Sequence, residues 1–297
     1  MKSPIAILFV LILISCNTPT KKPIDYGSNQ LVGKSVDIND IKIYYETYGE
    51  GEPLLLLHGN GGSLQHFEFQ IPELSKHFKI IAVDSRAQGR STDSDKEITY
   101  ALMASDMYEL INKLNLGSVN IVGWSDGGNI GLELAFAHPE KVKKLITFGA
   151  NYTHENYTSE EDSVNLDPND PLISLIKDMR QRRANNAATR LSPLPARTPE
   201  VKKKLDDLME KYPNFTEEQL EQIKVPTMVS VGDHDLINLD HALKLFRSLP
   251  HAELFIVPGA THVVLWEQPE LINSEIIKFL NTPYRDMDQY YFFKIPK

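Results

Sequence analysis

Short apolar runs alternate with amphipathic segments along most of the chain. The runs at 53–57 and 119–122 are apolar at almost every position, which is typical of strands buried on both faces of a sheet. Residues 99–116 instead carry apolar side chains at helical spacing along one stripe. The pattern predicts strands at 34–38, 41–48, 53–57, 78–83, 119–122, 144–148, 226–231 and 252–257, and core helices at 64–77, 99–116, 129–136, 240–249 and 269–280. This alternation indicates an α/β fold in which helices cover both faces of a mostly parallel sheet.

The alternation stops between residues 151 and 224. This segment is polar and has no convincing buried strand, but it contains helical patterns at 171–185, 199–212 and 216–223. We therefore predict a core formed by 34–150 and 225–297. The segment 151–224 is predicted to be a helical cap inserted over the carboxyl edge of the sheet, where open α/β sheets bind ligands. The aromatic tail at 283–297 is expected to pack against the core.

The first sixteen residues have the features of a bacterial export signal. Lys2 precedes the apolar run 5–14, which is too short to span a membrane as a mature helix but matches the hydrophobic part of a signal peptide. The sequence that ends at Cys16, the sole cysteine, resembles a lipoprotein signal. This resemblance implies a signal peptide at 1–15, a lipid on Cys16 and a location in the bacterial cell envelope, on the periplasmic side or the cell surface. An ordinary signal peptide with a chance cysteine is the alternative, and the polar segment 16–33 is expected to be a tether.

Composition and charge narrow the class of partner. The chain has 297 residues, of which 41% are hydrophobic, and this is enough for a sizeable core. Its net charge is −9, and it contains no basic patch interleaved with aromatic residues, so we expect no nucleic-acid partner. An acidic surface of this kind indicates solubility and does not select a substrate.

A candidate nucleophile lies between the strand at 119–122 and the helix at 129–136. The intervening stretch, Gly123-Trp124-Ser125-Asp126-Gly127, has the pattern Gly-x-Ser-x-Gly, which in a strand–turn–helix context indicates a nucleophile elbow. A turn this tight leaves no room for side chains at the two glycine positions. Its strain holds the Ser125 hydroxyl exposed at the carboxyl edge of the sheet. A glycine-rich loop that merely contains a serine is the alternative.

A serine hydroxyl needs a neighbouring base, and the base needs a carboxylate that orients it. His262 is the histidine that lies in a glycine-flanked loop after the last predicted strand. Asp235 follows the preceding strand, and the intervening residues suffice for one helix and one strand, so both loops return to the same edge. Asp233 is the alternative acid, but it directly follows the strand and should still be turning out of it. We therefore predict Ser125, Asp235 and His262 as catalytic residues.

Backbone N–H groups are expected to stabilise the negative charge that develops on the substrate oxygen. One is the N–H of Asp126 at the start of a helix, and the other is that of Asn60 in the glycine-rich loop 58–62, for which a flexible turn is the alternative. His58 is expected to shape this turn rather than to transfer protons. Trp124 and the carboxylate of Asp126 are candidate substrate contacts, the latter for a cationic group. A favourable interaction with the helix dipole is the alternative role for Asp126.

Several motifs, in this order, resemble the α/β-hydrolase superfamily: His58-Gly59-Asn60-Gly61-Gly62, Asp84-Ser85-Arg86-Ala87-Gln88-Gly89-Arg90-Ser91, Gly123-Trp124-Ser125-Asp126-Gly127-Gly128, Gly232-Asp233-His234-Asp235 and Gly259-Ala260-Thr261-His262. The chain order Ser, Asp, His is also that of this superfamily. The resemblance covers roughly residues 35–281 and implies an α/β-hydrolase fold with an eight-stranded sheet, although Ala87 stands where glycine is common. The serine motif and Gly149-Ala150-Asn151 are similar to the valacyclovir-hydrolase (biphenyl-hydrolase-like) branch, which cleaves esters, including amino-acid esters.

We therefore expect a serine hydrolase that cleaves an ester of a small molecule, or an amide or amino-acid ester, through an acyl-enzyme. Ser125 disfavours the dehalogenase and epoxide-hydrolase chemistries of the superfamily, which use an aspartate nucleophile. A carbon–carbon bond hydrolase with the same three residues is one alternative. A ligand-binding envelope lipoprotein without catalysis is the alternative from another class. The expected mechanism requires no metal and no organic cofactor.

Overall fold

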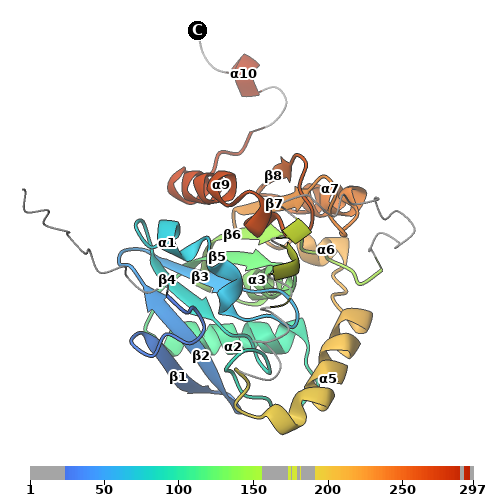
Figure 1. Ribbon diagram of the computed structural model, residues 1–297. Coiled ribbons are helices and arrows are strands. Elements are labelled where there is room, and N and C mark those ends of the chain that lie inside the picture. Colours follow the sequence, from blue (N-terminus) through green and yellow to red (C-terminus); the bar gives the residue numbers. More distant parts are fainter. Residues whose placement is uncertain are drawn as a thin grey trace, which may run out of the picture.

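An eight-stranded sheet forms the centre of the fold (Figure 1). The computed structural model describes residues 24–155, 173–174, 176–178, 181, 191–287 and 291–294. The strands are β1 Gly33–Ile38, β2 Ile41–Tyr48, β3 Pro53–Leu57, β4 Lys79–Val83, β5 Val119–Trp124, β6 Val142–Phe148, β7 Thr227–Gly232 and β8 Ala252–Val257. Their order is β1-β2-β4-β3-β5-β6-β7-β8; β2 pairs antiparallel with β1 and β4, and the other neighbours pair parallel. The predicted α/β fold with a mostly parallel sheet is confirmed.

The central strands are apolar because both faces of the sheet are covered. In β3, Leu55 and Leu57 join the hydrophobic core on one face, whereas Leu54 and Leu56 join the core on the other. Successive side chains of a strand point to opposite faces, so a run of leucines serves both cores. This explains why 53–57 lacks the polar–apolar alternation of a half-exposed strand.

Helices pack on both faces of the sheet. One core includes side chains of α2 Tyr100–Lys113, α3 Asp126–Ala137 and α7 Leu239–Ser248; the other includes side chains of η1 Leu64–Phe67, α1 Ile71–Leu74, α8 Val264–Glu267 and α9 Pro269–Asn281. The prediction of one helix at 64–77 is wrong, because η1 and α1 are separate. Pro72 has no N–H and cannot continue an existing helix, but it fits the first turn of a new one. The single turn α8 was not predicted because it is too short to show helical periodicity.

The segment before β1 packs on the core, contrary to the prediction that all of 16–33 is a tether. Glu46, a fully buried residue of β2, accepts hydrogen bonds from the backbone N–H groups of Gly27 (3.0 Å) and Asn29 (2.9 Å). Tyr26 is buried beside them. A buried carboxylate must satisfy its oxygens, and here the incoming chain supplies two of the donors. The residues from about Tyr26 onward therefore belong to the folded domain. Residues 1–23, including the predicted signal peptide and Cys16, lie outside the described residues.

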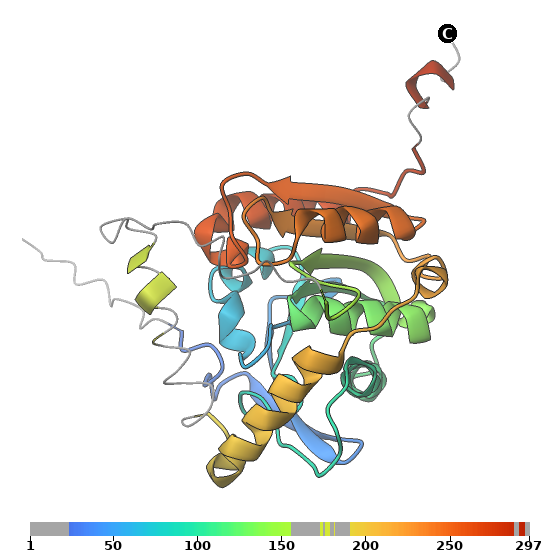
Figure 2. The same cartoon turned by 90° about the vertical axis from the view of Figure 1, so that its right-hand side faces the viewer.

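The predicted cap contributes one long described helix, α5 Thr198–Lys211, which runs along one side of the core (Figure 2). It follows the short turn η4 Pro195–Arg197, and α6 Glu217–Leu220 leads back to the sheet. Leu205 and Leu208 of α5 are buried in the core that contains α2 and α3. Most of the predicted helix at 171–185 lies outside the described residues.

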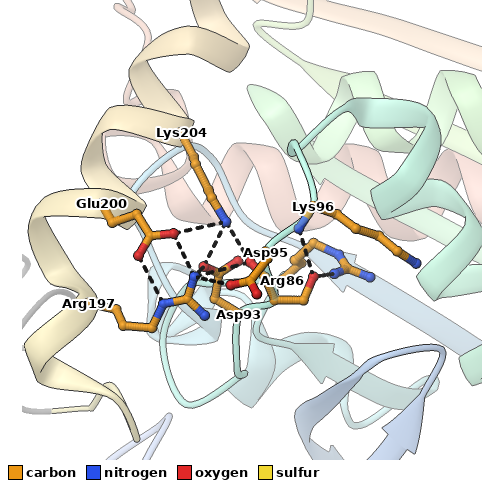
Figure 3. A network of polar contacts seen from close by, with 8 residues as sticks. Arg86, Asp93, Asp95, Lys96, Arg197, Glu200 and Lys204 are labelled. Atoms are coloured by element: carbon orange, nitrogen blue, oxygen red, sulfur yellow. Dashed lines mark hydrogen bonds and ion pairs between the residues drawn. The ribbon is translucent and has the colours of Figure 1, made fainter.

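Ion pairs hold α5 to the loop before α2 (Figure 3). The side-chain nitrogens of Arg197 and Lys204 lie 3.2 and 3.1 Å from Asp93 Oδ2, and the Asp93 side chain is 2% exposed. Lys211 and Glu97 form a further pair at 3.0 Å on the surface. A nearly buried carboxylate that pairs with two cations attaches the cap to the loop before α2 at a defined position. We call Asp93, Arg197 and Lys204 the cap latch.

The carboxyl-terminal tail does not pack as predicted. The core ends with α9, and the described part of 283–297 is largely exposed. Phe293, in the single turn α10 Tyr291–Lys294, is 80% exposed, and α10 lies apart from the domain in Figures 1 and 2. Within the described residues, no helix has both the length and the apolar composition needed to cross a bilayer.

Candidate active site

Ser125 sits in a strained turn between β5 and α3. Its backbone has φ 55° and ψ −120°, a conformation that side-chain-bearing residues rarely adopt outside functional sites. A Cβ atom at Gly123 would lie 2.2 Å from the Gly127 carbonyl oxygen, and one at Gly127 would lie 1.9 Å from the Leu57 carbonyl oxygen. The turn is therefore possible only with glycine at both positions, as the sequence predicts. Ser125 stays partly exposed at the carboxyl edge of the sheet.

His262 and Asp235 form a hydrogen-bonded pair at the same edge. His262 Nδ1 lies 2.7 Å from Asp235 Oδ1; the Asp235 side chain is fully buried and that of His262 is 16% exposed. The same oxygen accepts a hydrogen bond from the backbone N–H of Ile237 at 3.0 Å. An ionised carboxylate only accepts, so the proton of the pair belongs on Nδ1 and leaves Nε2 as the basic atom.

The alternative acid, Asp233, faces other groups. Its Oδ1 accepts a hydrogen bond from the backbone N–H of Ala260 at 3.2 Å and lies 2.7 Å from Nδ1 of His234. A backbone hydrogen bond from Gly259, together with the His234 contact, lowers the pKa of Asp233. Of the two aspartates, the structure therefore brings Asp235 to His262, and Asp233 instead organises the loop after β8.

Contacts around Gly149 bring the serine and the histidine into one neighbourhood. The backbone N–H of Ser125 donates to the Phe148 carbonyl at 2.8 Å, at the end of β6. The next residue, Gly149, has φ 59°, and a Cβ atom there would lie 2.7 Å from the His262 ring and 3.1 Å from Asp235 Oδ2. Gly149 thus leaves the room that the Asp–His pair occupies, a role that the local sequence pattern did not indicate.

Asp126 and the loop that carries Asn60 both lie next to Ser125. Asp126 is the first residue of α3, where backbone N–H groups have no partner within the helix. The loop that carries Asn60 approaches from the other side, since a Cβ atom at Gly59 would lie 3.1 Å from Ser125 Cβ. His58 holds this loop in place. Its Nδ1 lies 2.8 Å from the Gly59 carbonyl oxygen, and its Nε2 accepts a hydrogen bond of 3.0 Å from the backbone N–H of Ser85.

Trp124 is buried, which corrects its prediction as a substrate contact. Its indole is 3% exposed, and Nε1 donates a hydrogen bond of 2.8 Å to the backbone carbonyl of His262. Trp124 therefore ties the histidine loop to the residue before the nucleophile. The Asp126 carboxylate is also buried, and its Oδ1 accepts a hydrogen bond from the Tyr100 hydroxyl at 2.8 Å. This contact orients the carboxylate and argues against a fully solvated helix-end role.

One buried carboxylate joins two loops that border the site. Asp84 accepts hydrogen bonds from the backbone N–H groups of Leu64 and Arg90, both at 2.7 Å. It thereby links the segment after the oxyanion loop to the loop after β4. Burial raises the pKa of Asp84 to about 7, although its two backbone hydrogen bonds act in the opposite direction. The motif that contains Asp84 was recognised in the sequence, but this structural role was not.

A pocket of about 260 Å³ lies between the core and α5, and we call it the α5 pocket. Its core wall consists of Asn60, Gly61, Gly62, Ala87 and Gln88. Its outer wall consists of Ser192, Thr198, Val201, Lys202, Leu205 and Asp206. Asn60 belongs both to this wall and to the predicted oxyanion hole, whereas Ser125, Asp235 and His262 do not line the pocket. In the part of the chain that the structure describes, no cluster of His, Cys, Asp and Glu side chains could hold a metal ion.

The comparisons with known proteins agree with this architecture. Residues 52–220 match the family defined by the alpha/beta hydrolase fold. The chain belongs to this family. Among solved structures of the fold, a meta-cleavage product hydrolase from Pseudomonas fluorescens superposes with a TM-score of 0.69 at 21% identity, over 84% of this chain and 98% of that one. The alpha/beta-hydrolase fold predicted from the motifs is therefore confirmed.

Two curated relatives are also named as hydrolases. The chain is 26% identical to the 2-hydroxy-6-oxo-6-(2'-aminophenyl)hexa-2,4-dienoic acid hydrolase of Metapseudomonas resinovorans, over 84% of this chain and 91% of the relative. It is 32% identical to the serine hydrolase BPHL of Mus musculus over 49% of this chain and 50% of the relative, which agrees with the predicted biphenyl-hydrolase-like resemblance. Membership indicates a hydrolase, but the bond it cleaves must be argued from the site.

Proposed function

We propose that this alpha/beta hydrolase cleaves an ester bond of a small molecule through an acyl-enzyme intermediate. The observation that carries the proposal is the hydrogen-bonded pair of Asp235 and His262 at the edge of the sheet where Ser125 is held in a strained turn. A pure binding protein has no use for a strained serine next to an oriented imidazole, so this arrangement argues against the non-catalytic alternative. The same chemistry extends to amides and amino-acid esters.

In this proposal each group of the site has a role. Ser125 Oγ attacks the ester carbonyl carbon while His262 Nε2 takes the hydroxyl proton, and Asp235 stabilises the imidazolium through Nδ1. The N–H groups of Asn60 and Asp126 receive the negative charge on the carbonyl oxygen. The tetrahedral intermediate collapses, the alcohol leaves with the proton from His262, and Ser125 remains acylated. Water, activated by His262, then releases the acid and restores the serine.

A carbon–carbon bond hydrolase is the second candidate, and the similarity to the Metapseudomonas resinovorans enzyme favours it. Both reactions would use the same serine, histidine and aspartate. They differ in the leaving group, which is an alcohol oxygen in an ester and a carbanion equivalent in a dienoic acid. Turnover of a 2-hydroxy-6-oxohexa-2,4-dienoate but of no ester would replace the first proposal with the second.

The experiment is to compare wild type with Ser125→Ala on short p-nitrophenyl esters. By analogy with triad deletions, we expect kcat to fall by about 10⁴–10⁶-fold. Ser248→Ala is a matched control, because this serine lies on α7 and its hydroxyl bonds only within its own helix, to the Lys244 carbonyl. A fluorophosphonate probe should label wild type and Ser248→Ala but not Ser125→Ala. Full activity in folded Ser125→Ala, or no labelling of folded wild type, would contradict the proposal.

We also propose that the protein is attached to a bacterial envelope membrane through lipid on Cys16. Support comes from the signal-like sequence at 1–15 and from the position of the sole cysteine at its end. Two or more acyl chains meet what stable anchoring requires. Cys16→Ser should move the protein from the membrane fraction to the soluble fraction and abolish incorporation of labelled palmitate. Unchanged fractionation of the variant after a high-salt wash would contradict the anchor.

A further inference from the structure

A pair of buried asparagines, Asn129 and Asn151, joins two segments that leave the sheet beside each other. Pairing between the parallel strands β5 and β6 ends at Trp124 and Phe148. From there one chain turns into α3, whereas the other continues into the segment 149–154. The asparagines therefore connect the two chains at a point where the strands no longer do.

Every side-chain amide atom of this pair has a hydrogen-bond partner. Asn129 Nδ2 donates to Asn151 Oδ1 at 2.8 Å, and Asn129 Oδ1 accepts from the backbone N–H of Asn151 at 3.0 Å. The remaining group, Asn151 Nδ2, donates to the Thr153 carbonyl at 2.8 Å. The two residues are only 1% and 4% exposed, so the loss of one partner would leave a buried polar group unsatisfied. We call Asn129 and Asn151 the asparagine clamp.

The residues directly before the clamp pack without spare room. A Cβ atom at Gly128 would lie 2.7 Å from the Cβ atom of Ala150. The first turn of α3 can therefore approach the segment after β6 this closely only because residue 128 has no side chain. Together, this contact and the asparagine clamp fix the distance between the start of α3 and residues 149–151.

Each end of the asparagine clamp leads to one of the candidate catalytic residues. On one side, Asn129 lies one helical turn after Ser125, and its backbone N–H donates to the Ser125 carbonyl at 3.2 Å. On the other side, Asn151 lies two residues after Gly149, which leaves room for the His262 ring. A shift of α3 relative to the segment after β6 would therefore move the serine relative to the imidazole.

We propose that Asn129 and Asn151 are positioning residues that set the separation between Ser125 and His262. This inference rests on the proposed ester hydrolysis and adds two residues that support it. An apolar pair could also fill this space, but directional hydrogen bonds specify one relative position of the two segments more strictly. The proposal also gives a role to the motif Gly149-Ala150-Asn151, which has none in the reaction itself.

The first test replaces each asparagine of the clamp with alanine. It measures kcat and KM for a p-nitrophenyl ester, together with unfolding in urea. We expect Asn129→Ala and Asn151→Ala each to lower kcat by about 10- to 100-fold with KM nearly unchanged, because the reacting groups are misaligned while the contacts to the substrate remain. The double variant should lose little more than either single variant, since both changes break the same clamp.

Asn273→Ala is the matched control for this test. Asn273 is also buried, at 6% exposed, and its amide donates to the Phe69 carbonyl at 3.0 Å. It lies on α9, which packs on the other face of the sheet from α3. Asn273→Ala should lose stability to a similar extent and keep kcat within about threefold of wild type. An equal fall of kcat in this control, or additive losses in the double variant, would overturn the proposal.

The second test changes the close contact and leaves both asparagines in place. Gly128→Ala puts a methyl group 2.7 Å from the methyl group of Ala150 and so pushes the two segments apart. Helix propensity favours alanine over glycine, so a harmful effect must come from this contact. We expect kcat to fall by about tenfold, and Ala150→Gly in the same chain to restore most of the loss. An unchanged kcat in Gly128→Ala, or no recovery in the double variant, would contradict the proposal.

Failure of ester hydrolysis itself would look different, because no ester would react above the Ser125→Ala background. In that case crystal structures of wild type, of the double alanine variant of the clamp and of Asn273→Ala still test the positioning role. The distance from Ser125 Oγ to His262 Nε2 should increase by about 1 Å in the clamp variant and stay unchanged in Asn273→Ala. Equal distances in all three proteins would overturn the inference, whichever bond the enzyme cleaves.

Discussion

Trp124 and Trp266 form a matched pair for asking whether a hydrogen bond positions His262. Each indole is 3% exposed, and each donates from Nε1 to a backbone carbonyl at 2.8 Å. The acceptor is His262 for Trp124 and His66 for Trp266. The two rings touch, with centroids 4.9 Å apart. The bonds therefore share a chemistry and an environment and differ in the loop that they hold.

Replacing either tryptophan with phenylalanine removes the donor and leaves a carbonyl without its partner. Each change should lower the free energy of unfolding by about 1–3 kcal/mol. In Trp124→Phe the lost hydrogen bond also lets His262 move away from its catalytic position, which raises the activation barrier. A rise of about 1.4 kcal/mol in this barrier corresponds to a tenfold lower rate. We expect kcat of Trp124→Phe to fall by about 10- to 100-fold with KM nearly unchanged, because alignment is lost rather than substrate binding.

The assay is hydrolysis of a p-nitrophenyl ester over a full concentration range, combined with urea unfolding of both variants. Trp266→Phe should match Trp124→Phe in lost stability while keeping kcat within about threefold of wild type. If kcat falls by the same factor in both variants, the bond to His262 has no positioning role. The fall then reflects general loosening of the aromatic cluster. An unchanged kcat in Trp124→Phe would refute the reasoning more directly.

Three further predictions concern carboxylates. Asp235→Asn should lower kcat by about 10⁴-fold at neutral pH with the fold retained by circular dichroism, because an amide cannot hold the His262 tautomer. Burial raises the pKa of Asp84 to about 7, so the folded protein binds this proton more tightly than the unfolded chain. The free energy of unfolding should therefore fall as the pH rises from about 4 to about 7 in urea titrations, and Asp84→Asn should flatten that slope. Asp93→Asn should lower the free energy of unfolding by about 1–3 kcal/mol and raise KM, because α5 is held less firmly. This loss of stability should be smaller in about 1 M salt than at low salt, because salt screens the attraction between charges. An equal loss at both salt concentrations would contradict an electrostatic role for the cap latch.

Local patterns sufficed for the elements that bring the candidate catalytic residues together. Apolar runs marked the central strands, and parallel strands deliver the loops that carry Ser125, Asp235 and His262 to one edge. What the patterns missed depends on contacts between distant segments. The indole of Trp124 finds its acceptor 138 residues away, and nothing near the motif in sequence indicates that partner.

Errors in the predicted boundaries have similar causes. The helix expected at 64–77 breaks because Pro72 starts a new turn, a local signal that the apolar spacing obscured. The predicted tether extends too far because nothing in the sequence distinguishes Glu46 from an ordinary charged residue of a strand. In the fold, Glu46 is buried and accepts hydrogen bonds from the segment that precedes β1. The exposed tail after α9 is rich in aromatic residues, which composition alone assigns to a core.

The docking of Gly27 and Asn29 on Glu46 has a mechanical consequence for a lipid-anchored protein. Only ten peptide links then separate Cys16 from the buried Tyr26, and a segment of this length spans at most about 35 Å when fully extended. That is shorter than the domain diameter of roughly 50 Å expected for this chain length. A lipid-anchored domain could therefore not turn its Tyr26 side fully away from the bilayer. The length of this segment would thus limit the orientations in which Ser125 can meet the membrane surface.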